Sequence, residues 1–439
     1  RLITLRSAVQ IRPPQPINFV FEMKKIELLK KKISLNNIIF FLFLILPISI
    51  LSGNLLINIT ILSISLIFFL KIILKKIKFN YKNKIFILLI FFFISLIINL
   101  IFSDNYLLSY PRVIKFFFII FFIFSFRYLI LNTKYETLNK IYKFWFIVFS
   151  VVIFDLIFEY IIGHNILGYK SSMPNIRLAS FTGIESIIGN YFYGFSLIFL
   201  AYLYKKFPNK KFLNLSIAYF LIIISFLIGE RSNFIKTFII ILLFSFLVYE
   251  VRFKYKILSI LFICFFVVSF LNFNEGYKVR YFDQINKIFE KNGIKSYLDN
   301  SQYGAHYNVA GEIFKNNPVF GVGIKNFRVE SSKKKYEKLK HKYNKIRGNT
   351  HPHQIHYEFL SETGSFGYLC FLLFIFFSIF WSIKSYLNNK NIYQIAAILF
   401  VASSILPLIP SGSFFSTYSS SIFWINYAIM TGYINYKNN

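Results

Sequence analysis

Long apolar runs recur along almost the whole chain and are separated by short polar segments. An apolar run of about 15 to 22 residues is long enough to cross a membrane as a helix. The runs predict about twelve transmembrane helices, near residues 38–51, 54–74, 84–102, 112–131, 141–163, 186–204, 212–229, 233–250, 256–272, 366–385, 393–410 and 418–435. The first run is short and contains Pro47, so we expect it to form a helical hairpin with the second, turning at 52–54.

The longest polar segment separates two groups of predicted helices. Residues 23–272 would hold spans one to nine, residues 273–365 a large helical loop domain, and residues 366–439 spans ten to twelve. Residues 1–22 are interpreted as non-native upstream translation, because LRSAVQIRPPQP resembles the translated end of a transfer-RNA gene and Met23 is a more natural start. The predicted fold class is an all-α polytopic membrane protein.

The composition supports a membrane protein over a soluble one. The chain is 56% hydrophobic and 21% aromatic, with 18 acidic residues among 439, which is too apolar for a soluble domain of this size. The formal charge of +32 could suggest a nucleic-acid partner, but many lysines lie at the ends of apolar runs, where membrane orientation explains them. Cys264 and Cys370 lie within apolar runs, which argues against a disulfide framework or a cysteine metal site.

Basic residues are concentrated in alternate connections between the predicted helices. The loops SGN, SDNYLLSYP, GERS and PSGSFFSTYSS carry a single basic residue, Arg231, whereas the other short connections are rich in Lys and Arg. Because basic loops remain in the cytoplasm, both termini are expected inside and these sparse loops outside. The segment 273–365 is then also outside, since long loops translocate largely regardless of charge.

The polar window THPHQIHYEFLSETGSFG, residues 350–367, is the strongest candidate for chemistry. It holds three of the six histidines and two carboxylates at the entrance to an apolar run. A helix beginning after Pro352 would carry His353 and His356 on one face, and Gly364 and Gly367 would form the turn before the span.

Two further elements are predicted upstream in the same loop. Residues 305–317 read as an amphipathic helix that Pro318 ends, and NPVFGVGIKNF then supplies a turn with Gly321 and Gly323. Residues 331–345, SSKKKYEKLKHKYNK, predict a charged helix near the lipid headgroups, with a solvated helix as the alternative.

Together, these segments resemble the signature region of the O-antigen ligase and O-antigen polymerase family of bacterial inner-membrane glycosyltransferases. In that family a proline and G-x-G turn precedes an HPHN-x-x-L-x-x-L-x-E-x-G-x-x-G segment that enters a span. The resemblance extends from roughly residue 177 to the end. It implies transfer of a glycan from undecaprenyl diphosphate, on the periplasmic face of the inner membrane, to lipid A core or another glycan acceptor, without a cofactor.

The resemblance also implies roles for the histidine window. His353 takes the position of the proposed catalytic histidine, with His351 as its neighbour, and a histidine is suited to accept a hydroxyl proton near neutral pH. The alternative is a structural histidine that caps the helix. Glu358 and Glu362 could orient His353 or bind the acceptor, and Glu362 could equally hold the turn at Gly364. Two residues depart from the family pattern: Gln354 replaces an asparagine, and His306 stands near where many relatives carry an arginine.

Arginines are expected to bind the donor diphosphate, because guanidinium groups pair bidentately with phosphate and keep their proton. Arg231 in GERSNF and Arg177 in RLASFTGIESIIGNYF match two family arginines, and Arg280 is a further candidate. For Arg231 the alternative is an interfacial arginine that reaches to headgroups. For Arg177 and Arg280 it is an ordinary loop cation.

Several alternatives remain open from sequence. A zinc set of H-x-H-x-x-H with His306 and Glu358 is disfavoured by its spacing and by nearby arginines, so no metal is expected. Ligase is favoured over polymerase, and protein O-glycosylation is a third version. A lipid-linked glycan transporter is the competitor from another class; it would require charges buried in mid-span, for which Asp155 and Glu159 are the one close carboxylate pair. Direct displacement would invert the anomeric centre.

Overall fold

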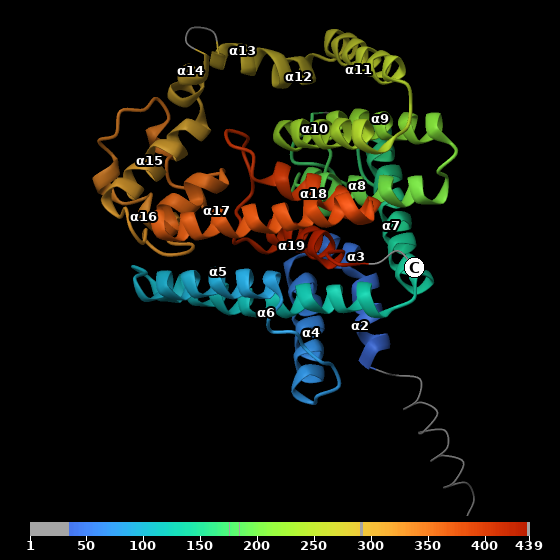
Figure 1. The fold of residues 1–439 in the computed structure, drawn as a ribbon. Helices are drawn as coiled ribbons and strands as arrows, with labels where there is room; N and C mark the ends of the chain where they lie inside the picture. Colours follow the sequence, from blue (N-terminus) through green and yellow to red (C-terminus); the bar gives the residue numbers. More distant parts are fainter. Residues whose placement is uncertain (1–34, 175, 184, 290–292, 437–439) are drawn as a thin grey trace, which may run out of the picture.

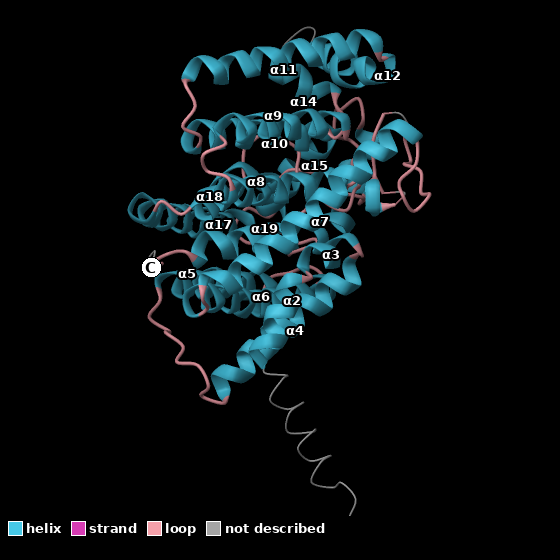
Figure 2. Ribbon diagram, turned by 90° about the vertical axis from the view of Figure 1, so that its right-hand side faces the viewer, coloured by secondary structure: helices cyan, strands magenta, loops and turns pink. Residues whose placement is uncertain are grey.

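The computed structural model describes residues 35–436 except 175, 184 and 290–292, and every regular element in that part is helical (Figures 1 and 2). The longer helices are α2 (Leu35–Leu44), α4 (Asn54–Ile73), α5 (Lys84–Ile101), α6 (Tyr106–Asn132), α7 (Tyr135–Ile162), α8 (Ile188–Lys206), α9 (Lys211–Leu227), α10 (Arg231–Val248), α11 (Phe253–Phe273), α14 (Gly293–Asn300), α15 (Gln302–Asn316), α17 (Ile355–Asn389), α18 (Ile392–Ser404) and α19 (Thr417–Gly432). Short helices are α3 (Leu46–Leu51), α12 (Glu275–Lys278), α13 (Gln284–Phe289) and α16 (Phe327–Glu330).

Each predicted apolar run carries a helix, and seven helices are long and apolar enough to cross a membrane. These are α4, α5, α6, α7, α10, α11 and α17. The chain is therefore a multi-pass helical membrane protein, while the count of twelve spans stays a prediction. The expected first hairpin is present: the chain breaks between α2 and α3 ahead of Pro47, and Gly53, at φ 108°, turns it so that α3 packs on α4.

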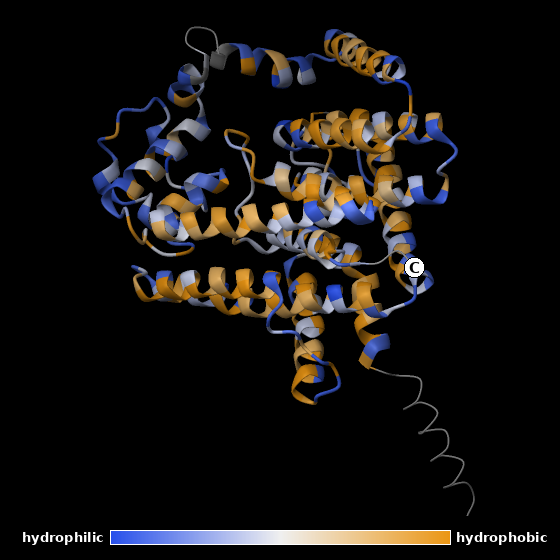
Figure 3. Ribbon diagram, viewed as in Figure 1, coloured by the Kyte–Doolittle hydropathy of each residue, from blue (hydrophilic) through white to orange (hydrophobic). Residues whose placement is uncertain are grey.

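Helix α8 lies at the centre of the molecule and α11 at its edge. Every α8 residue from 188 to 203 except Asn190 is buried, and α7, α10 and α18 pack around it. By contrast α11 buries only Lys256 and Ile263, and Leu258, Leu261 and Phe265 are each at least 60% exposed. An apolar helix face this exposed is stable against lipid rather than water. Figure 3 shows the apolar character of α11 along its length.

The loops that the charge pattern assigns to one side meet at one end of the helices. Asn326 donates to Ser103 Oγ (2.8 Å), and the Ser411 N–H donates to the His353 carbonyl (2.8 Å). The basic connection before α9 meets the basic connection after α10, away from these loops, and there Lys211 pairs with Glu250 at 2.8 Å. Thus the polar window shares one end of the bundle with the loops 103–105 and 408–416.

The amphipathic helix predicted at 305–317 is confirmed as α15, but the charged helix predicted at 331–345 is wrong. That segment holds two short 3-10 turns, Lys334–Tyr336 and Asn344–Ile346. The reason is the buried carboxylate of Glu330, which pairs with Lys333 at 2.5 Å and Lys335 at 2.6 Å and accepts a hydrogen bond from Tyr336 at 2.9 Å. These bonds wrap the chain around one point instead of extending it as a helix.

The glycine-rich segment 318–323 pairs its backbone with a break in α17. The Gly323 N–H donates to the Glu362 carbonyl (2.8 Å), and the Phe366 N–H donates to the Val319 carbonyl (3.1 Å). At Gly364 φ is 65° and ψ is −169°, outside helical values. A Cβ at Gly364 would lie 2.3 Å from the Val319 carbonyl oxygen, and one at Gly321 would lie 2.5 Å from the Glu362 backbone. Only glycine allows two backbones to approach this closely. The contact fixes the position of the histidine window relative to the segment 318–323.

Gly364→Ala is therefore expected to destabilise the protein by about 3 kcal/mol or more, because a left-handed backbone and a backbone clash coincide. The matched control is Gly311→Ala, within α15, where an added Cβ meets nothing within 4 Å and alanine should be neutral or slightly stabilising. Thermal unfolding in detergent measures both. Equal melting temperatures for the two variants would contradict this account of the helix break.

Candidate functional site

His353 lies just before α17, not on it. The helix begins at Ile355, and Gln354 is its N-cap, whose side chain accepts hydrogen bonds from the His356 N–H (2.6 Å) and the Tyr357 N–H (3.1 Å). His353 itself has a left-handed φ of 59°. The expected shared helical face with His356 is thus wrong, and the capping alternative belongs to Gln354. The amide oxygen explains why a glutamine can stand in for asparagine here.

The left-handed turn brings His353 beside His351 and beside His306 from α15. The ring centroids of His353 and His351 are 4.1 Å apart, and those of His353 and His306 are 5.4 Å apart. Asn349 Nδ2 contacts both Nε2 atoms, at 3.1 Å from His353 and 3.4 Å from His306. Three histidines and Asn349, from two separate segments, therefore form one cluster, which we call the histidine cluster.

Hydrogen bonds assign the protons in this cluster. Asn349 Oδ1 accepts from the Thr350 N–H at 2.7 Å, so its amide nitrogen must face the histidines and donate to them. His306 Nδ1 lies 3.1 Å from the Arg347 carbonyl oxygen and must donate to it, which leaves Nε2 as an acceptor. Both His306 and His353 are accordingly uncharged and unprotonated at Nε2.

Burial keeps the cluster uncharged. Desolvation, with a further contribution from His306, lowers the pKa of His353 to about 4. Desolvation, with His353 and Lys325 nearby, lowers the pKa of His351 to about 2. His351 Nε2 and Ser411 Oγ are buried without a hydrogen-bond partner in the described part of the chain. At neutral pH the cluster offers imidazole nitrogens that can accept a proton.

Two further polar side chains of the window, those of His356 and Glu358, are bound within the protein. His356 Nε2 lies 2.8 Å from the Ile405 carbonyl oxygen, and its Nδ1 lies 2.9 Å from the Tyr368 hydroxyl. Glu358 is 1% exposed and accepts from the Phe414 N–H at 2.8 Å and from Ser413 Oγ. Glu358 therefore anchors the loop 411–416 beside the histidines.

Sequence reasoning missed Lys325 and Asn349. Lys325 is 4% exposed, donates to Ser413 Oγ, and lies 3.9 Å from Glu358 Oε1. It follows the G-x-G turn directly, and a lysine in so apolar a stretch was a signal that could have singled it out. Asn349 had no such signal, because its role depends on the fold of the loop.

The three predicted arginines gather around the short turn before α10. Arg177 Nη2 lies 3.7 Å from Glu230 Oε1, Arg231 Nη1 donates to the Arg280 carbonyl (3.1 Å), and Arg280 Nε donates to the Gly229 carbonyl (2.6 Å). Burial lowers the pKa of Arg280, and the neighbouring Arg177 and Arg231 lower it further. Burial raises the pKa of Glu230, partly offset by Arg177. Among the described residues, Arg177–Glu230 is the one ion pair that any of these guanidinium groups forms, so the arginine cluster carries an excess of positive charge.

Asp155 and Glu159 hold Arg177's loop in place. Asp155 accepts from the Ile166 N–H at 2.8 Å, and Glu159 accepts from the Ala179 N–H at 3.0 Å and the Ser180 N–H at 2.6 Å. Glu159 and Arg177 also line a cavity of 340 Å3. The carboxylates that a transporter would need are thus used to bind backbone amides.

Tyr303, on α15, lies beside the histidine cluster. Its ring lies 5.6 Å from that of His353. In Figure 1, α14 and α15 lie between the segment of α12 and α13 and the start of α17. Helix α15, which carries Tyr303 and His306, packs on α14 and on α17, and α14 packs on α13.

Among the residues that the structure describes, no three His, Cys, Asp or Glu side chains are arranged to hold a metal ion. The histidines instead share the amide of Asn349. No curated protein matches the chain. Residues 215–372 match the family model described as O-antigen ligase, a region that contains Arg231, Arg280 and the whole histidine cluster. This match confirms the predicted resemblance to the O-antigen ligase family over this part of the chain.

Proposed function

We propose that the protein transfers a glycan from undecaprenyl diphosphate to an acceptor hydroxyl, as an O-antigen ligase at the periplasmic face of the inner membrane. The observation that carries the proposal is an uncharged histidine cluster at the start of α17 and a positively charged arginine cluster, joined by the successive packing of α13, α14, α15 and α17. One can take a proton from the acceptor, and the other can balance the charge of a diphosphate leaving group.

The reaction follows from these two parts. The acceptor oxygen attacks the anomeric carbon while the bond from that carbon to the diphosphate oxygen breaks. The hydroxyl proton moves to His353 Nε2, with the Asn349 amide turned aside. The diphosphate leaves with the bonding electron pair, and Arg231 and Arg280 stabilise its charge. His351 and His306 keep the base uncharged between turnovers, and Lys325 with Glu358 holds the neighbouring loop. Direct displacement would invert the anomeric centre.

Transfer by the purified wild-type protein in detergent, with EDTA present, tests the proposal. The donor is a glycan linked to a lipid diphosphate, and lipid A core is offered as acceptor. Glycan on the core establishes a ligase that needs no metal. Lengthening of the lipid-linked glycan would instead identify the polymerase alternative. No transfer to lipid, core or protein by a folded sample would refute the enzyme proposal and favour a transporter.

A carboxylate in place of Asn349 should change the pH dependence of transfer. His353 acts as a base only while unprotonated, so the rate falls as pH drops through its pKa, about 4 before substrate binds. Asn349→Asp places a negative charge beside His353 and His306, which favours the imidazolium. We expect the acidic limb of kcat/KM to move upward by roughly one to two pH units. Asn349→Ala is the control and should move it less. An unchanged limb in Asn349→Asp would rule out His353 as the titrating base.

A further inference from the structure

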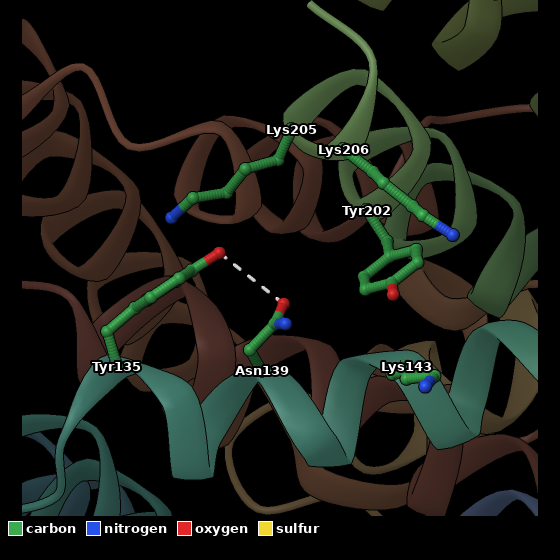
Figure 4. Close-up of a pocket in the computed structure, with 6 residues that line it drawn as sticks. All are labelled: Tyr135, Asn139, Lys143, Tyr202, Lys205 and Lys206. Atoms are coloured by element: carbon green, nitrogen blue, oxygen red, sulfur yellow. Dashed lines mark hydrogen bonds between the residues drawn. The ribbon is translucent and has the colours of Figure 1, made fainter.

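A cavity of 260 Å3 opens between α7 and α8 at the end of α8 far from the arginine cluster (Figure 4). Helix α8 begins beside Glu230, which accepts from the Gly189 N–H, and reaches the cavity at Lys205, about 24 Å further along the helix axis. The cavity is lined by Tyr135, Asn139 and Lys143 of α7 and Tyr202, Lys205 and Lys206 of α8. It is therefore separate from the proposed active site.

The lining of this cavity is cationic and rich in hydrogen-bond donors. It contains three lysines and no carboxylate, and none of those lysines forms an ion pair within the described part of the chain. Lys205 Nζ lies 3.9 Å from the centre of the Tyr135 ring, and the Tyr135 hydroxyl donates to Asn139 at 3.4 Å. Ammonium, hydroxyl and amide groups around one space are the chemistry that binds a phosphate group.

The same face of α7 continues as an exposed apolar stripe. From Lys143, steps of four, four and three residues reach Ile147, Val151 and Phe154, which are 47%, 46% and 62% exposed. Residues at this spacing share one side of a helix. A molecule with a phosphate at one end and a hydrocarbon chain at the other would match the cavity and the stripe together. If these lysines served only to orient the helices in the membrane, they would not need to line a cavity.

We propose that this cavity binds the phosphate of an anionic phospholipid headgroup, with an acyl chain lying along the α7 stripe. The headgroup would sit between Lys143, Lys205 and Lys206. Basic pockets between transmembrane helices are a recognised way to hold anionic lipids. This proposal does not depend on the proposed glycosyltransferase activity.

Native mass spectrometry of the full-length chain in detergent tests it, with phosphatidylglycerol and phosphatidylcholine as probes. Replacing Lys143, Lys205 and Lys206 with Gln should weaken phosphatidylglycerol binding by roughly ten- to a hundredfold and leave phosphatidylcholine unchanged. The matched control replaces Lys75, Lys76 and Lys78, which follow α4 at the same end of the bundle, where Lys71 lies over the Tyr128 ring.

Two outcomes would overturn the proposal. One is equal phosphatidylglycerol binding by the pocket and control variants. The other is full displacement of the lipid from the wild type by millimolar inorganic phosphate, which would make the ligand a soluble phosphate. Thermal unfolding checks that each variant is folded. If the triple variant is not, the single Lys143→Gln and Lys206→Gln variants, at exposed positions, should each lose severalfold in affinity.

Discussion

His353→Ala is expected to lower the rate of glycan transfer by about 10²- to 10⁴-fold, the range that general-base catalysis usually contributes. Removing the imidazole deprives the acceptor hydroxyl of its proposed base, while His306 and His351 stay at their own positions in the cluster. Donor binding should change little, since the arginine cluster stays intact. The effect should therefore appear in kcat more than in KM for the donor.

Two variants separate catalysis from structure in this test. His164→Gln changes a histidine whose Nδ1 contacts the Asn165 carbonyl, away from the cluster, and should keep full activity. His356→Gln removes contacts to Tyr368 and Ile405 and should lower the melting temperature more than the rate per folded molecule. Full activity in His353→Ala would refute the catalytic assignment. A loss explained wholly by unfolding would leave His353 as the structural residue that sequence reasoning also allowed.

The helices were predictable because apolar runs of membrane length leave little choice of structure in lipid. The pairing of the loops at each end followed from charge, since basic residues alternate between connections. The failures occurred where long-range contacts decide the local structure. Residues 331–345 have the composition of a helix, but buried Glu330 draws three of their side chains to itself. No local pattern could reveal that carboxylate's burial.

In the candidate site, too, local sequence patterns predicted some features and long-range contacts decided others. Helical periodicity predicted that His353 and His356 lie on one helix face. His353 precedes the N-cap, however, so its backbone is not restricted to helical values, and it adopts a left-handed conformation. The glycines of the window were recognised as a turn, but their backbone contact with 318–323 was not. Lys325 is buried against Glu358 only because the backbone of 318–323 contacts the glycines of the window. The family motif identified the residues, and the fold decides which of their atoms are available.

Arg231→Ala should lower transfer by about 10²- to 10³-fold, as the loss of one fixed charge donor at a developing anion does. Its Nη1 is held by the Arg280 carbonyl at 3.1 Å and Gln284 Oε1 at 3.4 Å, which fixes the guanidinium plane. Arg177 differs, because Glu230 already faces it. Arg231 and Arg280 are therefore the stronger candidates for the diphosphate.

Comparing Arg231→Lys with Arg231→Ala distinguishes charge from geometry. Lysine keeps the charge but not the planar fork, so it should recover only part of the rate if bidentate binding matters. Arg252→Ala is the matched control: Arg252 is the N-cap residue of α11 and, like Arg231, lies at the start of a helix, but it is exposed in a connection on the basic side of the bundle. Wild-type kcat in Arg231→Ala with only a raised donor KM would mean that Arg231 binds substrate and transition state equally. Arg280 would then be the residue that stabilises the leaving-group charge, and Arg280→Ala should lower the transfer rate more than Arg231→Ala does.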